Sequence, residues 1–152
     1  MPTSTLARTE AIPALKNVPL FAGLTPQQLR RVSEVGRVRL FRAGSAIVHL
    51  GEPGDTFYVI LHGRALVVRE TGRPLKLGTG DFFGELALIE NAPRSADVIA
   101  TDDVTALAIG HTAFKRLLRS EAAFTYAILR TVIGRLRNDQ RAPRWELDNL
   151  TS

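Results

Sequence analysis

The alternation of apolar and polar residues predicts a short N-terminal helix followed by a series of strands. Residues 24–35 place apolar side chains at helical spacing, with Thr25 as the expected N-cap and Pro26 at the first helical position. From residue 37 the period changes to two, so Val38 and Leu40 should face the same side of a strand. Turns rich in glycine and proline separate the short apolar runs that follow. The predicted strands lie within residues 37–42, 45–50, 56–63, 65–70, 75–78, 95–101 and 104–110.

Helical spacing returns towards the C-terminus. We expect one helix over 113–120, capped by Thr112, and a longer helix over 122–139 that Pro143 stops. Short strands with a turn signal roughly every eight to twelve residues are typical of a β-sandwich or barrel. The predicted fold class is therefore mainly β with flanking helices, an antiparallel barrel with one N-terminal helix and two C-terminal helices.

Length and composition narrow the class of protein. The chain has 152 residues, of which 45% are hydrophobic, enough for one domain with a buried core. It contains no cysteine, which excludes disulfides, thiolate catalysis and zinc–thiolate sites. No apolar run reaches the roughly 18 residues of a membrane span, and the N-terminus lacks a secretory signal, so we expect a cytoplasmic protein. The net charge of +5 suits an acidic partner, but the late arginines also fit a solvated helix face.

The candidate chemistry lies in one interval between the predicted strands, residues 80–98. Gly84 permits a close backbone approach and opens a short helix whose unpaired N–H groups suit an anion. Arg94 offers a planar fork of donors for phosphate oxygens, with the Ser95 hydroxyl beside it. Glu85 would repel a phosphate, but its carboxylate can accept a hydrogen bond from a ribose 2′-hydroxyl. Together these residues indicate a cyclic nucleotide; singly, each also fits a turn glycine, a surface arginine or a helix-start acid.

The segment FGELALIENAPRSA, residues 83–96 (the cassette), closely resembles the phosphate-binding cassette of the cyclic nucleotide-binding domain family. This family includes the catabolite activator protein, kinase regulatory subunits and gated channels. The resemblance covers most of residues 18–140, leaving an N-terminal extension at 1–17 and a C-terminal tail at 141–152. It implies an antiparallel β-roll of jelly-roll type, in which Glu85 accepts the ribose 2′-hydroxyl and Arg94 pairs with the cyclic phosphate. The ligand-binding residues it implies are Phe83, Gly84, Glu85, Leu86, Ala87, Arg94, Ser95 and Ala96.

Recognition of the base is less clearly encoded. We favour cyclic AMP as the ligand, with cyclic GMP as the alternative, because the Ser95 hydroxyl suits both. Asp97 departs from the uncharged residue that usually follows Arg-Ser-Ala in the family, and it would weaken anion binding only if it faced the ligand. The resemblance also implies that a residue of the last helix, or just past it, closes over the base. The candidates are Arg137, Asn138, Asp139 and Trp145.

The expected function is regulatory rather than catalytic. The 3 histidines are isolated, so we expect no metal site, and no nucleophile or acid–base pair indicates an enzyme. We expect a cyclic nucleotide sensor, without a further cofactor, that repositions its C-terminal helices to signal to a protein partner or a fused effector. We expect no DNA-binding module in this chain. Leu129, Val132 and Leu136 on the last predicted helix suit either a homodimer seam or packing back on the barrel. The alternative is a protein-interaction scaffold of the same fold with a ligand-free pocket.

Overall fold

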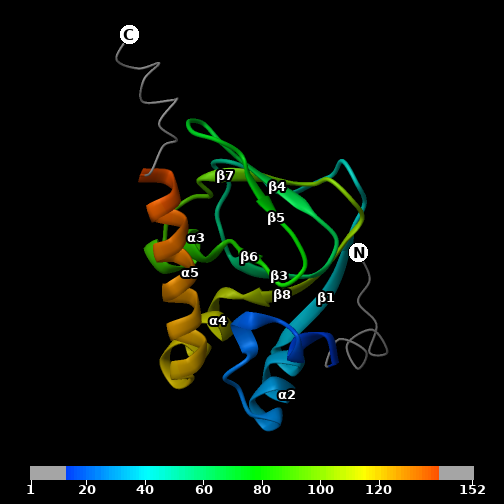
Figure 1. Cartoon of the computed structure of the whole chain (residues 1–152), viewed down its shortest axis with the longest axis vertical. Coiled ribbons are helices and arrows are strands. Elements are labelled where there is room, and N and C mark those ends of the chain that lie inside the picture. The colour runs from blue at the N-terminus through cyan, green and yellow to red at the C-terminus, as the bar shows by residue number, and fades with distance from the viewer. Residues whose placement is uncertain (1–12, 141–152) are drawn as a thin grey trace.

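The computed structural model describes residues 13–140, in which two antiparallel four-stranded sheets form a β-roll flanked by helices (Figure 1). The strands are β1 (Gly36–Phe41), β2 (Ala46–Val48), β3 (Thr56–His62), β4 (Ala65–Arg69), β5 (Leu75–Leu77), β6 (Phe82–Phe83), β7 (Ala96–Ala100) and β8 (Val104–Gly110). Helical segments are η1 (Pro19–Phe21), α2 (Pro26–Val35), α3 (Glu85–Glu90), α4 (His111–Ser120) and α5 (Ala122–Gln140). The strand orders are β1-β8-β3-β6 and β2-β7-β4-β5. The predicted fold class is confirmed.

The strands form where apolar side chains can pack against both faces of a sheet. In β3, Phe57 and Val59 face the helices while Tyr58 points into the roll, which explains its unbroken apolar sequence. Val38 and Leu40 lie two residues apart in β1, on one face of the strand as predicted, but Val38 is 8% exposed whereas Leu40 is 54% exposed. Val38 belongs to the core beneath the helices, whereas Leu40 lies further along the edge strand β1, outside that core.

The N-terminus of α2 follows the prediction. Thr25 Oγ1 accepts a hydrogen bond from the backbone N–H of Gln28 at 3.2 Å, and Gln28 Oε1 accepts one from the backbone N–H of Thr25 at 2.8 Å. This reciprocal capping box satisfies two N–H groups that the first helical turn leaves without partners. Thr25 is therefore the N-cap, and Pro26 begins the helix as expected.

The prediction that Thr112 caps the next helix is wrong. Helix α4 begins at His111, with Gly110 as its N-cap and no side-chain cap. The reason is that β8 runs straight into α4, and the backbone N–H of His111 donates to the Asp55 carbonyl at 2.8 Å. The longer helix α5 confirms the predicted range to within one residue, and Pro143 lies outside the described residues.

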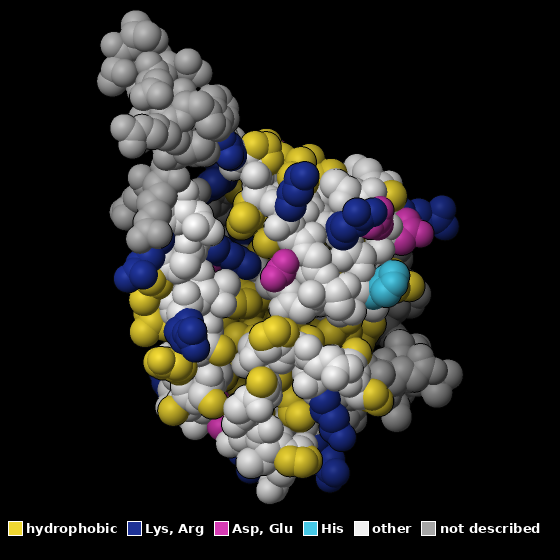
Figure 2. Space-filling view, viewed as in Figure 1, with side chains coloured by type: hydrophobic (Ala, Val, Ile, Leu, Met, Phe, Trp, Pro, Cys, Tyr) yellow, Lys and Arg dark blue, Asp and Glu magenta, His cyan; other side chains and the backbone are white. Residues whose placement is uncertain are grey.

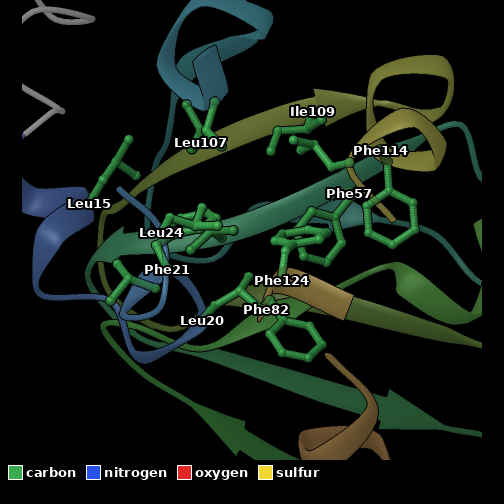
Figure 3. Packing of buried hydrophobic residues seen from close by; sticks show 14 of the residues in the cluster. Leu15, Leu20, Phe21, Leu24, Phe57, Phe82, Leu107, Ile109, Phe114 and Phe124 are labelled. Atoms are coloured by element: carbon green, nitrogen blue, oxygen red, sulfur yellow. The ribbon is translucent and has the colours of Figure 1, made fainter. Parts of the chain in front are cut away.

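Two apolar clusters hold the roll and its helices together. One lies between the β1-β8-β3-β6 sheet and the helices, and the other fills the roll. In the first, the ring centroids of Phe57 and Phe114 lie 4.6 Å apart and those of Phe21 and Phe124 lie 6.1 Å apart (Figure 3). Leu15, within the predicted N-terminal extension, is fully buried in the same cluster. Because Phe124 belongs to α5, this packing fixes that helix along one side of the roll (Figure 1).

Candidate ligand-binding site

Helix α3 begins at a position that only glycine fits. Gly84 follows β6 directly and has φ +92°, in the left-handed region that other residues rarely adopt. A Cβ at Gly84 would lie 2.7 Å from Nη1 of Arg94 and 2.9 Å from the Thr56 carbonyl oxygen. Gly84 therefore lets the backbone approach the arginine closely. The next residue, Glu85, turns inwards and is only 4% exposed.

Arg94 is a buried cation held by backbone carbonyls. It is 7% exposed, and its Nη1 and Nη2 groups donate to the carbonyls of Gly84 at 3.1 Å and Thr56 at 2.6 Å. Its own backbone N–H donates to the Glu52 carbonyl at 2.8 Å, which ties the cassette to the turn before β3. Burial lowers the pKa of Arg94, but a guanidinium stays charged in proteins. The site thus contains a planar cation in a fixed orientation.

Glu85 pairs with an arginine from the far end of the chain. Nη1 of Arg135, on α5, lies 3.4 Å from Oε1 of Glu85, and its Nη2 donates to the Phe82 carbonyl at 2.6 Å. The Arg135 guanidinium also lies over the Phe82 ring, 4.7 Å from its centroid. Burial raises the pKa of Glu85, and the charges of Arg135 and Arg94 oppose that rise. One arginine therefore binds both α3 and β6 to α5.

A single cavity of about 160 Å³ brings the sequence-predicted residues together. Phe83, Gly84, Glu85, Leu86, Ala87, Arg94, Ser95 and Ala96 all line it. The remaining lining residues are Val48, Val67, Arg69, Leu75, Val98, Val132, Arg135, Leu136 and Asn138. Figure 2 shows basic side chains gathered along the boundary between α5 and the roll.

The structure separates the candidates for contact with the base. Asn138 lines the cavity, whereas Arg137 is exposed and does not. Trp145 lies outside the described residues, and so does the side chain of Asp139. Arg135 was not among the predicted residues. In the sequence, only helical spacing distinguishes Arg135 from the other late arginines. It follows Val132 by three residues, which places both side chains on one face of the helix.

Asp97 does not face the cavity. Within β7, Ala96 and Val98 are buried and Asp97 between them is half-buried on the opposite face. Its Oδ1 accepts a hydrogen bond from the backbone N–H of Leu50 at 2.7 Å. The carboxylate thus secures the end of β2 and lies away from the buried arginine.

Residues 13–140 contain neither a candidate metal site nor a helix that could span a membrane. In this range no group of three or more His, Cys, Asp or Glu side chains is placed to hold a metal ion. None of the helices described is long and apolar enough to cross a membrane.

The fold and the cavity define a ligand-binding domain of the helix-flanked β-roll class. The family model for the cyclic nucleotide-binding domain matches residues 38–121, more than half of the chain, and the chain belongs to this family.

Three of the proteins similar to this chain are regulatory parts of protein kinases. The cAMP-dependent protein kinase regulatory subunit of Hypocrea atroviridis is 42% identical over 104 residues, which make up 68% of this chain and 22% of that protein. The regulatory domain of Toxoplasma gondii PKA, solved with cAMP, matches with a TM-score of 0.74 and 31% identity over 84% of this chain and 51% of that one. The regulatory subunit of a cAMP-independent protein kinase A from Trypanosoma brucei matches with a TM-score of 0.72 and 28% identity, over 82% and 46% respectively. The chain thus spans only part of these relatives.

Proposed function

We propose that residues 18–140 form a regulatory, non-catalytic domain that binds cyclic AMP in this cavity and signals through α5. The observation that carries the proposal is the presence of one buried cation, Arg94, and one buried carboxylate, Glu85, in the wall of the same cavity. A cyclic nucleotide carries the two groups that match them, an anionic phosphate and a ribose hydroxyl. The relatives named above as cAMP-dependent support the choice of cyclic AMP.

The roles of the cassette residues follow from this pairing. Arg94 neutralises the cyclic phosphate, with the Ser95 hydroxyl and the Ala96 backbone as further donors. Glu85 accepts from the ribose 2′-hydroxyl. Phe83, Leu86 and Ala87 shape the wall, with Gly84 allowing the close approach described above. The base then contacts the remaining apolar wall, formed by Val48, Val67, Leu75, Val98, Val132 and Leu136.

Helix α5 shifts when the ligand binds. The cavity of about 160 Å³ is smaller than the roughly 300 Å³ at the lower limit of typical small-molecule sites. Four of its lining residues belong to α5, so movement of this helix enlarges it; they are Val132, Arg135, Leu136 and Asn138. A ligand changes the helix position only if it binds the two positions with different affinity. Contact between the base and α5 supplies that difference.

A calorimetric titration with cyclic AMP tests the role of Arg94. Arg94→Lys keeps the charge but loses the planar fork, so affinity should fall by at least about tenfold. The matched control is Arg37→Lys, because Arg37 is an exposed arginine of β1 that does not line the cavity. If Arg94→Lys and wild type bind cyclic AMP with equal affinity, Arg94 does not bind the phosphate through its guanidinium.

A second titration tests Glu85. Wild type should bind cyclic AMP more tightly than its 2′-deoxy analogue, and Glu85→Gln should reduce that difference. Glu90→Gln is the matched control, since Glu90 ends the same helix and is exposed. If deoxy and ribose ligands bind wild type equally, Glu85 does not contact the sugar.

The outer face of α5 supports a second copy of this chain as a partner. Leu129 and Leu136 are each 53% exposed, seven residues apart as in a coiled-coil seam, and Leu136 lies where this face meets the cavity that it also lines. Val132 packs against the core, so it is absent from that face. Sedimentation with and without cyclic AMP should detect a dimer that Leu129→Gln weakens. If no cyclic nucleotide raises the melting temperature, the same apolar face favours the protein-interaction scaffold.

A further inference from the structure

The edge strand β1 presents two arginines at the end of a sheet. Among the described strands β1 pairs only with β8, so the backbone N–H and C=O groups on its outer edge have no ladder partner there. Arg37 and Arg39 lie two residues apart on one face of β1 and line a hollow of about 650 Å³. Arg39 lies over the Phe41 ring, 5.2 Å from its centroid. Across residues 13–140 neither arginine forms an ion pair, and no acidic side chain lines the hollow.

The opposite face of β1 carries an exposed leucine. Val38 packs in the core beneath the helices, but Leu40, the next residue on that face, is 54% exposed. The edge of β1 therefore combines two cations on one face with an apolar side chain on the other. An extended segment that paired with both faces would need acidic residues at alternate positions and apolar residues between or beside them.

The sequence after α5 contains such a segment. Residues 145–148 read Trp-Glu-Leu-Asp, and Glu146 and Asp148 are the only two acidic residues of the chain that stand two positions apart. In an antiparallel pair, Asp148 would lie opposite Arg37. The same register would place Glu146 opposite Arg39, so that each arginine faces a carboxylate.

This register also matches the apolar residues. Leu147 would lie opposite Val38, and Trp145 opposite Leu40, on the face away from the charges. Trp145, also a candidate for contact with the base, would then cover the exposed leucine. None of the β1 residues in this contact lines the ligand cavity.

The reach of the chain favours a second molecule as the source of the segment. From Gln140, the last residue of α5, to Glu146 the chain extends at most about 22 Å. A domain of this size is about 35 Å across, and α5 ends on the opposite side of the roll from β1 (Figure 1). We propose that residues 145–148 of a second copy of this chain add to the edge of β1 as an antiparallel strand.

Sedimentation of the full chain tests this contact by exchanging charges. Every variant also carries Leu129→Gln, so that association through α5 does not contribute. Arg37→Glu with Arg39→Glu should weaken self-association at least about tenfold, because like charges then face each other. Glu146→Arg with Asp148→Arg should weaken it similarly. An equimolar mixture of these two variants restores opposite charges in both contacts, so association should recover.

A charge control and a spectroscopic signal complete the design. Arg116→Glu with Arg119→Glu changes the net charge equally at two exposed arginines of α4 outside the hollow, and association should change by less than about twofold. Trp145 is the only tryptophan of the chain, so its emission reports on this segment alone. The emission should move to shorter wavelength as association proceeds, and Leu40→Ser should reduce that shift.

Three results would overturn the proposal. The first is a full chain that does not self-associate at any concentration, and the second is a mixture of the two charge-reversed variants that does not recover. The third is an α4 control that weakens association as much as the reversal at β1 does. If the Trp145 emission is independent of concentration but changes in the charge-reversed variants, the segment pairs within one molecule and the second copy is wrong.

Discussion

Replacing Arg135 with methionine removes the polar contacts between the second half of α5 and the cassette. The wild-type side chain is 21% exposed and makes three contacts: the ion pair with Glu85, the hydrogen bond to the Phe82 carbonyl, and the position over the Phe82 ring. Methionine keeps the apolar stem and loses the guanidinium. The substitution therefore tests the contacts rather than the packing.

The size of the effect follows from these contacts. A hydrogen bond from a charged group contributes about 1.5–3 kcal/mol, and a cation over an aromatic ring about 0.5–1 kcal/mol. Ordering a long side chain costs up to about 2 kcal/mol. The loss also leaves the buried Glu85 carboxylate without its ion-pair partner, which is unfavourable. We expect Arg135→Met to lower the free energy of unfolding by about 2 kcal/mol at neutral pH.

The pH dependence identifies Glu85 as the cause. The pKa of Glu85 is raised in the folded protein above its ordinary value of 4.5. Between 4.5 and the raised value the folded state binds more protons than the unfolded state, so stability falls as pH rises through this window. Removing Arg135 removes an interaction that lowers this pKa, so the pKa rises further. The deficit of Arg135→Met should therefore shrink as the pH falls towards 4.5 and grow above it.

Urea unfolding of a double-mutant cycle measures this coupling. The cycle comprises wild type, Arg135→Met, Glu85→Gln and the double variant, and its coupling energy should be at least about 1 kcal/mol. Arg130→Met is the control on the same helix, since Arg130 is exposed; it should shift stability by less than about 0.5 kcal/mol. A coupling energy near zero, or a deficit that is the same at acid and neutral pH, would refute the reasoning.

Three further substitutions test the fold and the cassette. Phe124→Ala should lower the free energy of unfolding by about 3–5 kcal/mol in urea titrations, because its ring is fully buried against Phe21 and Phe57; a loss under 1 kcal/mol would contradict this packing. Gly84→Ala should lower both thermal stability and affinity for cyclic AMP, because the new Cβ meets Arg94 and the φ is unfavourable; unchanged affinity would show that the cassette tolerates displacement of the arginine. Asp97→Asn should leave affinity for cyclic AMP within about twofold in calorimetry, since its carboxylate accepts from Leu50; a larger gain in affinity would place its charge near the ligand.

The parts of the fold that were predictable depend on local order in the sequence. The apolar run of β3 and the N-cap at Thr25 are short-range patterns, and both appear in the structure where expected. The exposure of Leu40 and the missing cap at Thr112 depend on which elements lie next to them. Local patterns do not contain that information, so the exposure of Leu40 could not be predicted and the prediction of a cap at Thr112 was wrong.

The residues that line the cavity also divide into those within one short segment and those brought there by the packing of distant elements. The cassette residues are close together in the chain, so their combined chemistry was visible in one segment. Arg69 and Arg135 reach the cavity from β4 and α5, and their positions depend on strand register and on the packing of Phe124. In the sequence each was one arginine among many, and the late arginines resembled a solvated face.

Glu85 connects the cavity to the helix that would carry the signal. In this structure its carboxylate pairs with Arg135, and under the proposed function the same carboxylate accepts from the ribose. The two partners compete for one group, so a ligand that takes it also weakens a contact holding α5. By linkage, a change that loosens α5 must alter ligand affinity by the free energy with which the ligand displaces the helix. A sensor built in this way needs no relay of residues, because recognition of the sugar and release of the helix occur at one side chain.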